Sequence, residues 1–264
     1  MSIAFLPRPG TLEEALRLLD ANPAAQPIAG GQFLVPALGR EARPQANLMA
    51  IDKLPELSGI TKLDGRLTIG AGECHARVTS SDVVAEAIPA LAALVGSIGD
   101  PQVRARGTLG GALCSGDPLI DYAAACLGLG AVLQTSRGEL SAEDFFALDS
   151  QPRLLPADIL KSVAFQIPNR AGYAKLKQSA AGYALVGVFV SQKEGDVRVA
   201  VIGGWGRPVR SPVLESVLAS RFAPDSIVDD LPIEEGLLDD DLASADYRRA
   251  LVLELTRRAV HNAI

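Results

Sequence analysis

The chain has 264 residues, 48% of them hydrophobic and 21% charged, a balance that is typical of globular proteins and argues against a disordered or fibrous chain. A net charge of −6 disfavours binding to nucleic acid or anionic lipid, because sequence-independent binding to either needs a basic surface. Three cysteines without CxxC spacing argue against an iron–sulfur or zinc site built from this chain alone. No segment reaches the ~20 uncharged apolar residues that span a bilayer. Because so few cysteines, and an odd number of them, fit a reducing compartment, the sequence predicts a cytoplasmic protein.

The first 57 residues predict alternating helices and strands. Thr11 and Glu14 form a capping-box pattern, in which a hydroxyl at the N-cap is followed three residues later by a carboxylate, and the next apolar positions fall on one helical face. This helix has to end before Pro23, because the residue before a proline is disfavoured in a helix. The further elements predicted here are a strand over 27–29, a helix over 33–38 and a strand over 48–52.

Residues 58–168 predict strands at either end and helices between them. Asp64-Gly65 lies between two alternating segments and is typical of a hairpin turn. The predicted helices are 81–88 and 89–98, of which the second is apolar on most sides and is therefore expected to be buried. The predicted strands that follow are 128–134 and 159–167.

Residues 168–172, Pro-Asn-Arg-Ala-Gly, are the best candidate for a domain boundary, because proline, asparagine and glycine favour turns. Beyond them the sequence predicts three strands, over 173–177, 184–192 and 197–205, and then helices. The stretch from Asp225 to Asp246 holds nine carboxylates and no Lys or Arg. We interpret it as a solvated connector.

Two Gly-Gly segments, Ala29–Leu34 and Thr108–Ala112, are candidate ligand-binding features. Paired glycines let backbone N–H groups approach a ligand without an intervening Cβ, and consecutive N–H groups form an anion-binding nest. Two nests fit a pyrophosphate, and a side chain at Gly30 or Gly110 is then predicted to obstruct it, although either pair alone could be an ordinary turn. Neither segment is GxGxxG or GxxxxGK(S/T), so a dinucleotide would need a fold other than the Rossmann or P-loop fold.

The sequence becomes specific between Ile98 and Tyr122. The runs IGDPQVRARGTLGG (98–111) and SGDPLIDY (115–122) resemble the FAD-binding signature of the molybdenum hydroxylases, specifically of the medium, flavoprotein subunit of the xanthine dehydrogenase and carbon monoxide dehydrogenase group. The opening AGGQ of residues 29–32 is similar to that family's first pyrophosphate loop. Further similar stretches are 68–75, 144–146, 173–177, 207–210 and 243–249, so the resemblance covers essentially the whole chain.

This resemblance implies an α+β flavoprotein of two domains. Residues 1–168 would form a vanillyl-alcohol-oxidase-type (PCMH-type) FAD-binding domain, with subdomains of about 1–57 and 58–168. Residues 171–264 would form a small C-terminal domain of the carbon monoxide dehydrogenase flavoprotein type, made of an antiparallel sheet and helices.

The resemblance also implies the residues that hold noncovalent FAD. The pyrophosphate would lie against Ala29, Gly30, Gly31, Gln32, Phe33 and Leu34 of the first segment and Thr108, Leu109, Gly110, Gly111 and Ala112 of the second. Asp121 would hydrogen-bond the sugar or ribityl part of the cofactor, although its carboxylate could instead cap a helix over 122–127. Apolar contacts to the flavin ring are implied for Ile98 and Leu160, which could equally be core residues. A cation near the ring, which would favour the anionic reduced flavin, is implied at Lys177, which could also be a surface lysine.

Two residues depart from the family pattern. Phe33 stands where Ser or Thr is usual, and Ala112 stands where Asn or Ser is common. Each change removes a polar side chain that could contact the cofactor, so more of the binding is left to backbone N–H groups.

The resemblance implies that the chain is the FAD-carrying electron-transfer subunit of a molybdenum hydroxylase complex, with no catalytic acid or base and no metal ligands of its own. Its partners would be a small subunit with 2Fe–2S clusters and a large molybdopterin subunit, in a heterotrimer or its dimer. Electrons from the clusters would leave the flavin for an external acceptor. Two alternatives are a stand-alone FAD-dependent dehydrogenase or oxidase of the same fold, and a flavin-free assembly or scaffold protein.

Overall fold

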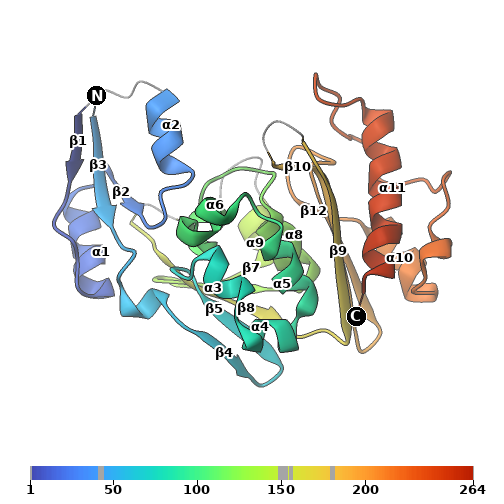
Figure 1. The fold of residues 1–264 in the computed structure, drawn as a ribbon, viewed down its shortest axis with the longest axis horizontal. Coiled ribbons are helices and arrows are strands. Elements are labelled where there is room, and N and C mark those ends of the chain that lie inside the picture. The colour runs from blue at the N-terminus through green and yellow to red at the C-terminus, as the bar shows by residue number, and fades with distance from the viewer. Residues whose placement is uncertain (1, 41–44, 148–153, 155–156, 179–181, 264) are drawn as a thin grey trace.

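Three β-sheets, of three, five and four strands, follow one another along the described chain. The structure is a computed structural model, and the residues that it describes are 2–40, 45–147, 154, 157–178 and 182–263. Figure 1 shows the sheets in chain order from left to right, with helices in front of the five-stranded sheet and α11 on the outer side of the four-stranded sheet. The chain therefore has a mixed α/β fold in which the sheets are neighbours.

The first sheet is parallel, with strand order β1-β3-β2. As predicted, Thr11 is the N-cap of α1 and accepts a hydrogen bond from the Glu14 N–H, while the Glu14 carboxylate accepts one from the Gly10 N–H at 2.7 Å. Leu19 of this helix packs with Met49 of β3 in a small core. The elements are β1 (Ser2–Phe5), α1 (Leu12–Ala21), β2 (Ala25–Ile28), α2 (Leu34–Arg40), β3 (Gln45–Ala50) and the 3-10 helix η1 (Pro55–Leu57).

The five-stranded sheet is antiparallel, in the order β4-β5-β8-β6-β7. Alternate residues, such as Leu67 and Ile69 of β5 and Val163 and Phe165 of β8, lie in the main core, as the period-two geometry of strands requires. The predicted Asp64-Gly65 hairpin turn is confirmed, with positive φ at both residues. The strands are β4 (Ile60–Leu63), β5 (Arg66–Gly70), β6 (Val132–Thr135), β7 (Gly138–Ser141) and β8 (Leu160–Gln166).

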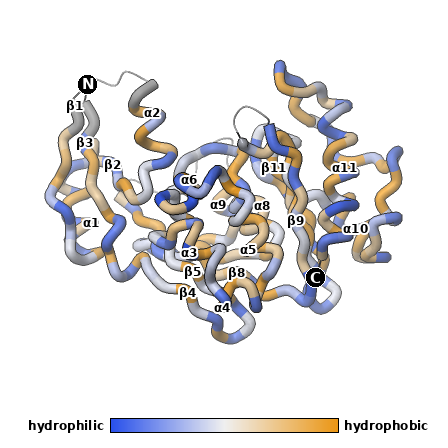
Figure 2. The backbone as a smooth tube through the Cα atoms, viewed as in Figure 1, coloured by the Kyte–Doolittle hydropathy of each residue, from blue (hydrophilic) through white to orange (hydrophobic). Residues whose placement is uncertain are grey.

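The segments between β5 and β6 contribute the helices of the main core. Every residue of α8 is buried, and α5 buries Leu91, Leu94 and Val95. Figure 2 shows these two apolar helices next to the polar α6. The helices are α3 (His75–Thr79), α4 (Asp82–Ala87), α5 (Pro89–Gly96), α6 (Pro101–Arg106), α7 (Leu109–Leu113) and α8 (Asp121–Gly128), and α9 (Ala142–Phe146) follows β7.

The four-stranded sheet, in the order β12-β11-β10-β9, is covered on both faces. Phe189 of β10 lies in the main core, whereas Val188 lies in a second core with Leu253 of α11. A Cβ at Gly172 would lie 1.9 Å from the Ala259 carbonyl oxygen, so only glycine fits where α11 crosses β9. The elements are β9 (Arg170–Lys177), β10 (Ala184–Lys193), β11 (Asp196–Ile202), β12 (Val209–Arg210), α10 (Pro212–Ser220), the 3-10 helix η2 (Pro224–Ser226) and α11 (Ala245–His261).

Two sequence predictions are wrong in detail. The strand predicted over 128–134 starts at Val132, because Gly128 is the last residue of α8. A helix that is buried on all sides carries no polar face, so periodicity could not separate it from the strand that follows. Strand β1, which precedes the first predicted helix, was missed, although it pairs with β3 along its full length.

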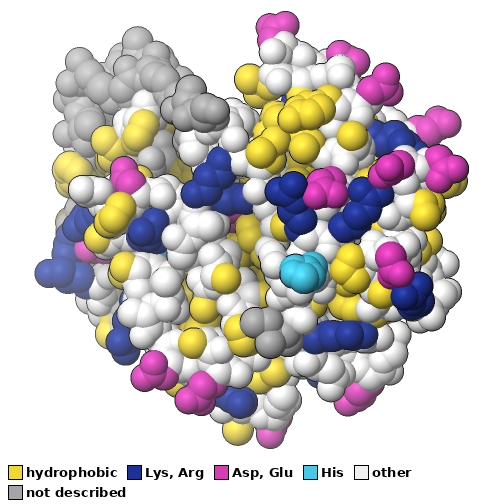
Figure 3. All heavy atoms as spheres, turned by 45° about the vertical axis from the view of Figure 1, so that its right-hand side comes forward, with side chains coloured by type: hydrophobic (Ala, Val, Ile, Leu, Met, Phe, Trp, Pro, Cys, Tyr) yellow, Lys and Arg dark blue, Asp and Glu magenta, His cyan; other side chains and the backbone are white. Residues whose placement is uncertain are grey.

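The acidic stretch of residues 225–246 is more than a solvated connector. Asp229 pairs with Arg257, and Asp240 pairs with Arg248 at 2.7 Å, both on α11. Figure 3, turned so that the C-terminal helices come forward, shows acidic and basic side chains side by side on this face. Among the described helices, none combines the length and the apolar composition that a membrane crossing requires.

Candidate cofactor site

The first glycine segment connects β2 to α2 and carries free hydrogen-bond donors. The backbone N–H groups of Gly30, Gly31, Gln32 and Phe33 have no acceptor among the described residues. Gly31 has φ +75°, a conformation that glycine adopts without strain and other residues rarely adopt. Since backbone donors away from bulk water are normally paired, four donors in succession without an acceptor make this half-buried segment a candidate anion-binding nest.

The second glycine segment is the first turn of α7, and its donors are already used. Thr108 is the N-cap, and its hydroxyl accepts from the Gly111 N–H at 3.1 Å. The N–H groups of Leu109 and Gly110 donate to carbonyls of the preceding segment 71–73. The prediction of a second open nest is therefore wrong, because a neighbouring backbone segment takes these donors. Contact between Thr108–Ala112 and a cofactor through other groups stays a prediction.

Each glycine segment packs closely against another part of the backbone. A Cβ at Gly30 would be 2.0 Å from the Arg106 carbonyl oxygen and 3.0 Å from Gly107 Cα, just before the second segment. A Cβ at Gly110 would be 2.8 Å from Ala71 Cβ. Both glycines therefore face protein backbone or side chain, which corrects the prediction that a side chain at either position would obstruct a phosphate. Their role in the described structure is to allow these close approaches.

Asp121 lies in a nearly buried cluster with two residues of β9. Its Oδ1 accepts from the Tyr173 hydroxyl at 2.5 Å and from Lys175 Nζ at 2.6 Å, and the Lys175 side chain is only 5% exposed. Burial lowers the pKa of Lys175, although the Asp121 charge opposes this, and burial together with the Asp121 charge raises the pKa of Tyr173 well above its usual value. The phenol therefore stays protonated and donates to the carboxylate.

The capping alternative for Asp121 is wrong, because the N-cap of α8 is Ile120 and Asp121 is the first residue inside the helix. A carboxylate in the first turn of a helix is stabilised by the helix dipole. Its Oδ2 has no hydrogen-bond partner among the described residues. This oxygen is therefore an acceptor that a ligand hydroxyl could use.

The other predicted contact residues occupy different environments. Lys177 is exposed and lies on the same face of β9 as Tyr173 and Lys175. Ile98 follows α5, packs on the main core, and accepts a hydrogen bond from Arg104 at its carbonyl. Leu160, 4% exposed, begins β8 and is part of the main core. A cofactor contact stays a prediction for Lys177, Ile98 and Leu160.

Phe33 links the first glycine segment to the four-stranded sheet. Its ring centroid lies 6.4 Å from that of Tyr183, the residue before β10. The Tyr183 carbonyl accepts from the Gln178 N–H, just beyond Lys177 at the end of β9. Together with the approach of Gly30 to Arg106, this ring contact places the first glycine segment beside the end of α6 and beside the connection from β9 to β10.

Three residues at this region were not singled out from the sequence. Tyr173 and Lys175 alternate with Lys177 along β9, and this period-two spacing is the signal that could have identified them. His75 is buried with Nδ1 3.4 Å from the Tyr122 hydroxyl, and its backbone N–H donates to the Gly107 carbonyl. Burial, assisted by the Arg104 charge, lowers the pKa of His75 to about 4, so the imidazole is neutral at pH 7.

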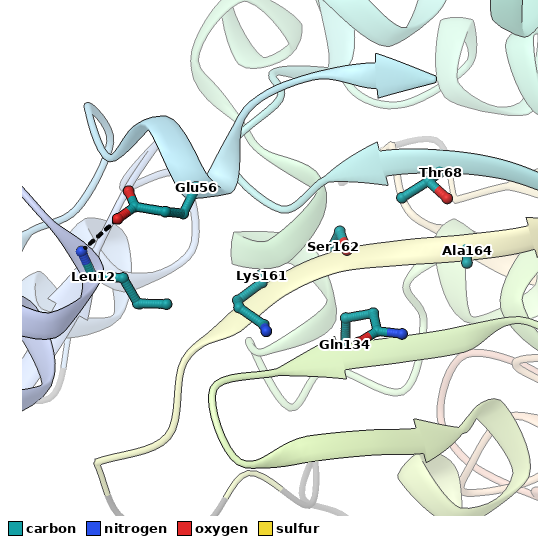
Figure 4. A pocket seen from close by; sticks show the side chains of 7 residues that line it. All are labelled: Leu12, Glu56, Thr68, Gln134, Lys161, Ser162 and Ala164. Atoms are coloured by element: carbon teal, nitrogen blue, oxygen red, sulfur yellow. Dashed lines mark hydrogen bonds between the residues drawn. The ribbon is translucent and has the colours of Figure 1, made fainter. Parts of the chain in front are cut away.

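An open hollow of about 540 Å³ lies elsewhere, on the outer face of the five-stranded sheet. Figure 4 shows Leu12 and Glu56 at one end of it, Thr68 and Ala164 of the sheet at the other, and Lys161 between them. None of the predicted cofactor residues lines it. Within the described ranges, no group of three or more His, Cys, Asp or Glu side chains is placed to hold a metal ion.

The donor set fits a dinucleotide pyrophosphate that carries a polyhydroxylated chain. Four free N–H groups at residues 30–33 match phosphate oxygens, and the free Oδ2 of Asp121 matches a hydroxyl. The fold is thus that of a mixed α/β domain with donors and an acceptor suited to such a ligand. Residues 3–169 match the family described as FAD binding domain in molybdopterin dehydrogenase, and the chain belongs to this family.

Known relatives span nearly the whole chain. The chain is 31% identical to nicotine 6-hydroxylase medium subunit of Paenarthrobacter nicotinovorans, over 96% of this chain and 94% of that protein. It is 30% identical to carbon monoxide dehydrogenase medium chain of Hydrogenophaga pseudoflava, over 97% and 95%. Among solved structures, quinoline 2-oxidoreductase from Pseudomonas putida 86 superposes with a TM-score of 0.85 at 26% identity, over 99% of this chain and 95% of that one. These relatives are oxidoreductase subunits, as the resemblance implied.

Proposed function

We propose that this chain carries noncovalent FAD and transfers electrons within a molybdenum hydroxylase complex. The observation that carries the proposal is the run of four backbone N–H groups at residues 30–33 that have no acceptor in the described part of the structure, in a chain of the FAD-binding family. The named relatives support it, since they are medium subunits of hydroxylase and dehydrogenase complexes.

Each predicted segment has a separate task in holding the cofactor. The N–H groups of Ala29–Leu34 bind the pyrophosphate, and Thr108–Ala112 lines the site through groups other than its engaged N–H donors. Asp121 accepts a hydroxyl of the ribityl or sugar part. Ile98 and Leu160 provide apolar surface near the ring, and Lys177 provides positive charge there. FAD, when bound, supplies the redox chemistry, while the chain's own residues bind it, orient it and exclude water.

The proposed domain division follows the sheets. Residues 1–168 form the vanillyl-alcohol-oxidase-type domain, with the three-stranded parallel sheet in the subdomain of about 1–57 and the five-stranded sheet in 58–168. Residues 171–264 form the C-terminal domain. The family match to residues 3–169 supports a boundary near residue 168.

The proposed partners are a small subunit with 2Fe–2S clusters and a large molybdopterin subunit, in a cytoplasmic heterotrimer or its dimer. The heteromeric state of the relatives supports this assembly. Electrons would reach the flavin from the clusters and leave it for NAD+, a quinone, dioxygen or another acceptor. Substrate oxidation would take place on the large subunit.

The first test is whether the purified chain retains FAD after dialysis. We expect the chain to show a flavin absorption spectrum and to release the flavin on denaturation, because binding is noncovalent. Asp121→Asn, which keeps the shape of the side chain but removes its charge, should bind FAD about tenfold more weakly. Asp64→Asn is the matched control, since Asp64 lies in an exposed turn with φ 48°, which Asn accepts. A folded chain that retains no flavin would favour the scaffold alternative.

The second test separates a subunit from a stand-alone enzyme. In anaerobic stopped-flow measurements, dithionite should bleach the flavin of the lone chain, whereas heterocycles, aldehydes and carbon monoxide should not. Adding the small and large subunits should make substrate bleaching possible. Rapid bleaching of the lone, metal-free chain by an organic substrate would contradict the proposal.

A further inference from the structure

The Asp121 cluster contains a cation, the Lys175 ammonium group, which has no role in the FAD-binding site proposed above. Lys175 reaches Asp121 from β9, 54 residues along the chain, and its ammonium group is nearly buried. Of its three N–H donors, one has an acceptor among the described residues, which is Asp121 Oδ1. Tyr173 donates to the same oxygen. One carboxylate oxygen is thus held by two donors, and the other is left open.

This arrangement fixes the orientation of the Asp121 carboxylate. Two donors on Oδ1 prevent the carboxylate from rotating freely, so Oδ2 keeps one direction. Without Lys175, Oδ1 would keep only the Tyr173 hydroxyl as a donor, and Asp121, a residue that is only 7% exposed, would lose its ion-pair partner. The carboxylate would then be free to turn, and Oδ2 would no longer point in the same direction.

We propose that Lys175 is a positioning residue for FAD, which acts by fixing the orientation of the Asp121 carboxylate so that Oδ2 is presented to a cofactor hydroxyl. This rests on the proposed function, in which Asp121 contacts FAD. The role differs from that of Lys177, which is exposed and whose side chain makes no hydrogen bond or ion pair within the described residues. Lys175 acts through Asp121, so its effect on FAD should disappear when Asp121 is changed.

The test is a double-mutant cycle on FAD affinity, measured by flavin fluorescence titration. Lys175→Met should weaken binding about tenfold, because the Asp121 carboxylate is then no longer held with Oδ2 towards the cofactor. Asp121→Asn should weaken it by a similar factor, and the double variant should be no more than about twofold weaker than the weaker single variant. Lys175→Arg, which keeps the charge, should recover most of the affinity, and Lys62→Met, an exposed strand lysine, should leave it unchanged.

The outcomes separate the two claims. Losses that multiply to about a hundredfold in the double variant, or a Lys175→Met variant that binds FAD like the wild type, would overturn the positioning role and leave the proposed function intact. A wild-type chain that binds no FAD would overturn both. If Lys175→Met does not fold, as judged by circular dichroism, Lys175→Gln replaces it in the same cycle, since it removes the charge while keeping an N–H donor.

Discussion

The two glycine segments look alike in sequence but differ in what their backbones do. Residues 30–33 have four N–H groups without acceptors in the described structure, whereas Leu109, Gly110 and Gly111 donate theirs to a neighbouring segment and to the Thr108 cap. A Gly-Gly pair is therefore not a nest by itself. It becomes one only where no neighbouring backbone or cap takes its donors, and only the first segment meets this condition.

The largest expected effect comes from the contact of the first segment with the end of α6. Gly30→Ala places a Cβ 2.0 Å from the Arg106 carbonyl oxygen, so the backbone has to move. We expect a loss of about 3 to 4 kcal/mol in the free energy of unfolding, measured by denaturant titration. Gly10→Ala is the control, since its Cβ would lie 3.7 Å from a Glu14 carboxylate oxygen. A Gly30→Ala protein as stable as the control would show that Gly30 is not tightly packed against Arg106.

The second effect is a pH dependence of the free energy of unfolding, which arises from His75 beside the second segment. The pKa of His75 is lowered from 6.5 to about 4, so the unfolded state binds its proton more readily than the folded state. The neutral, buried His75 contributes its full share to the free energy of unfolding above pH 6.5. As the pH falls from 6.5 towards 4, about 3 kcal/mol of this free energy is lost. His75→Phe should flatten this slope, and His261→Phe, at the end of α11, should not. An unchanged slope in His75→Phe would contradict the assignment.

A smaller loss of stability is expected when the N-cap of the second segment, Thr108, is removed. Thr108→Ala removes the hydroxyl that accepts from the Gly111 N–H, and loss of such an N-cap typically costs about 1 kcal/mol. Thr108→Ser keeps the hydroxyl and should be close to wild type in thermal melting. Equal stability of the Ala and Ser variants would show that the cap contributes nothing here.

The smallest effect concerns the side chain of the first segment. Phe33→Leu loses the ring contact to Tyr183, which should cost about 0.5 to 1 kcal/mol in the free energy of unfolding. FAD affinity should change by less than about twofold, because the backbone N–H groups remain. A tenfold change in affinity, measured by equilibrium dialysis, would mean that the Phe33 side chain contributes directly to the binding of FAD.

Local features could be predicted from the sequence and non-local ones could not. The Thr11–Glu14 cap and the Asp64-Gly65 turn depend on residues a few positions apart, and both are confirmed. The ion pair of Asp121 with Lys175 joins residues 54 positions apart. Likewise, the use of the second segment's donors depends on a strand-like partner at residues 71–73. Neither the ion pair nor the pairing of these donors can be predicted from composition or spacing, because tertiary packing creates both.

Amide hydrogen exchange of the purified chain, with and without FAD, tests the central claim most directly. The claim is that the first segment supplies the pyrophosphate donors while those of the second are already engaged. We predict that FAD slows exchange strongly at residues 30–33, whereas Leu109, Gly110 and Gly111 are protected already in the absence of FAD and change little. Strong FAD-dependent protection at 109–111, with none at 30–33, would contradict the account.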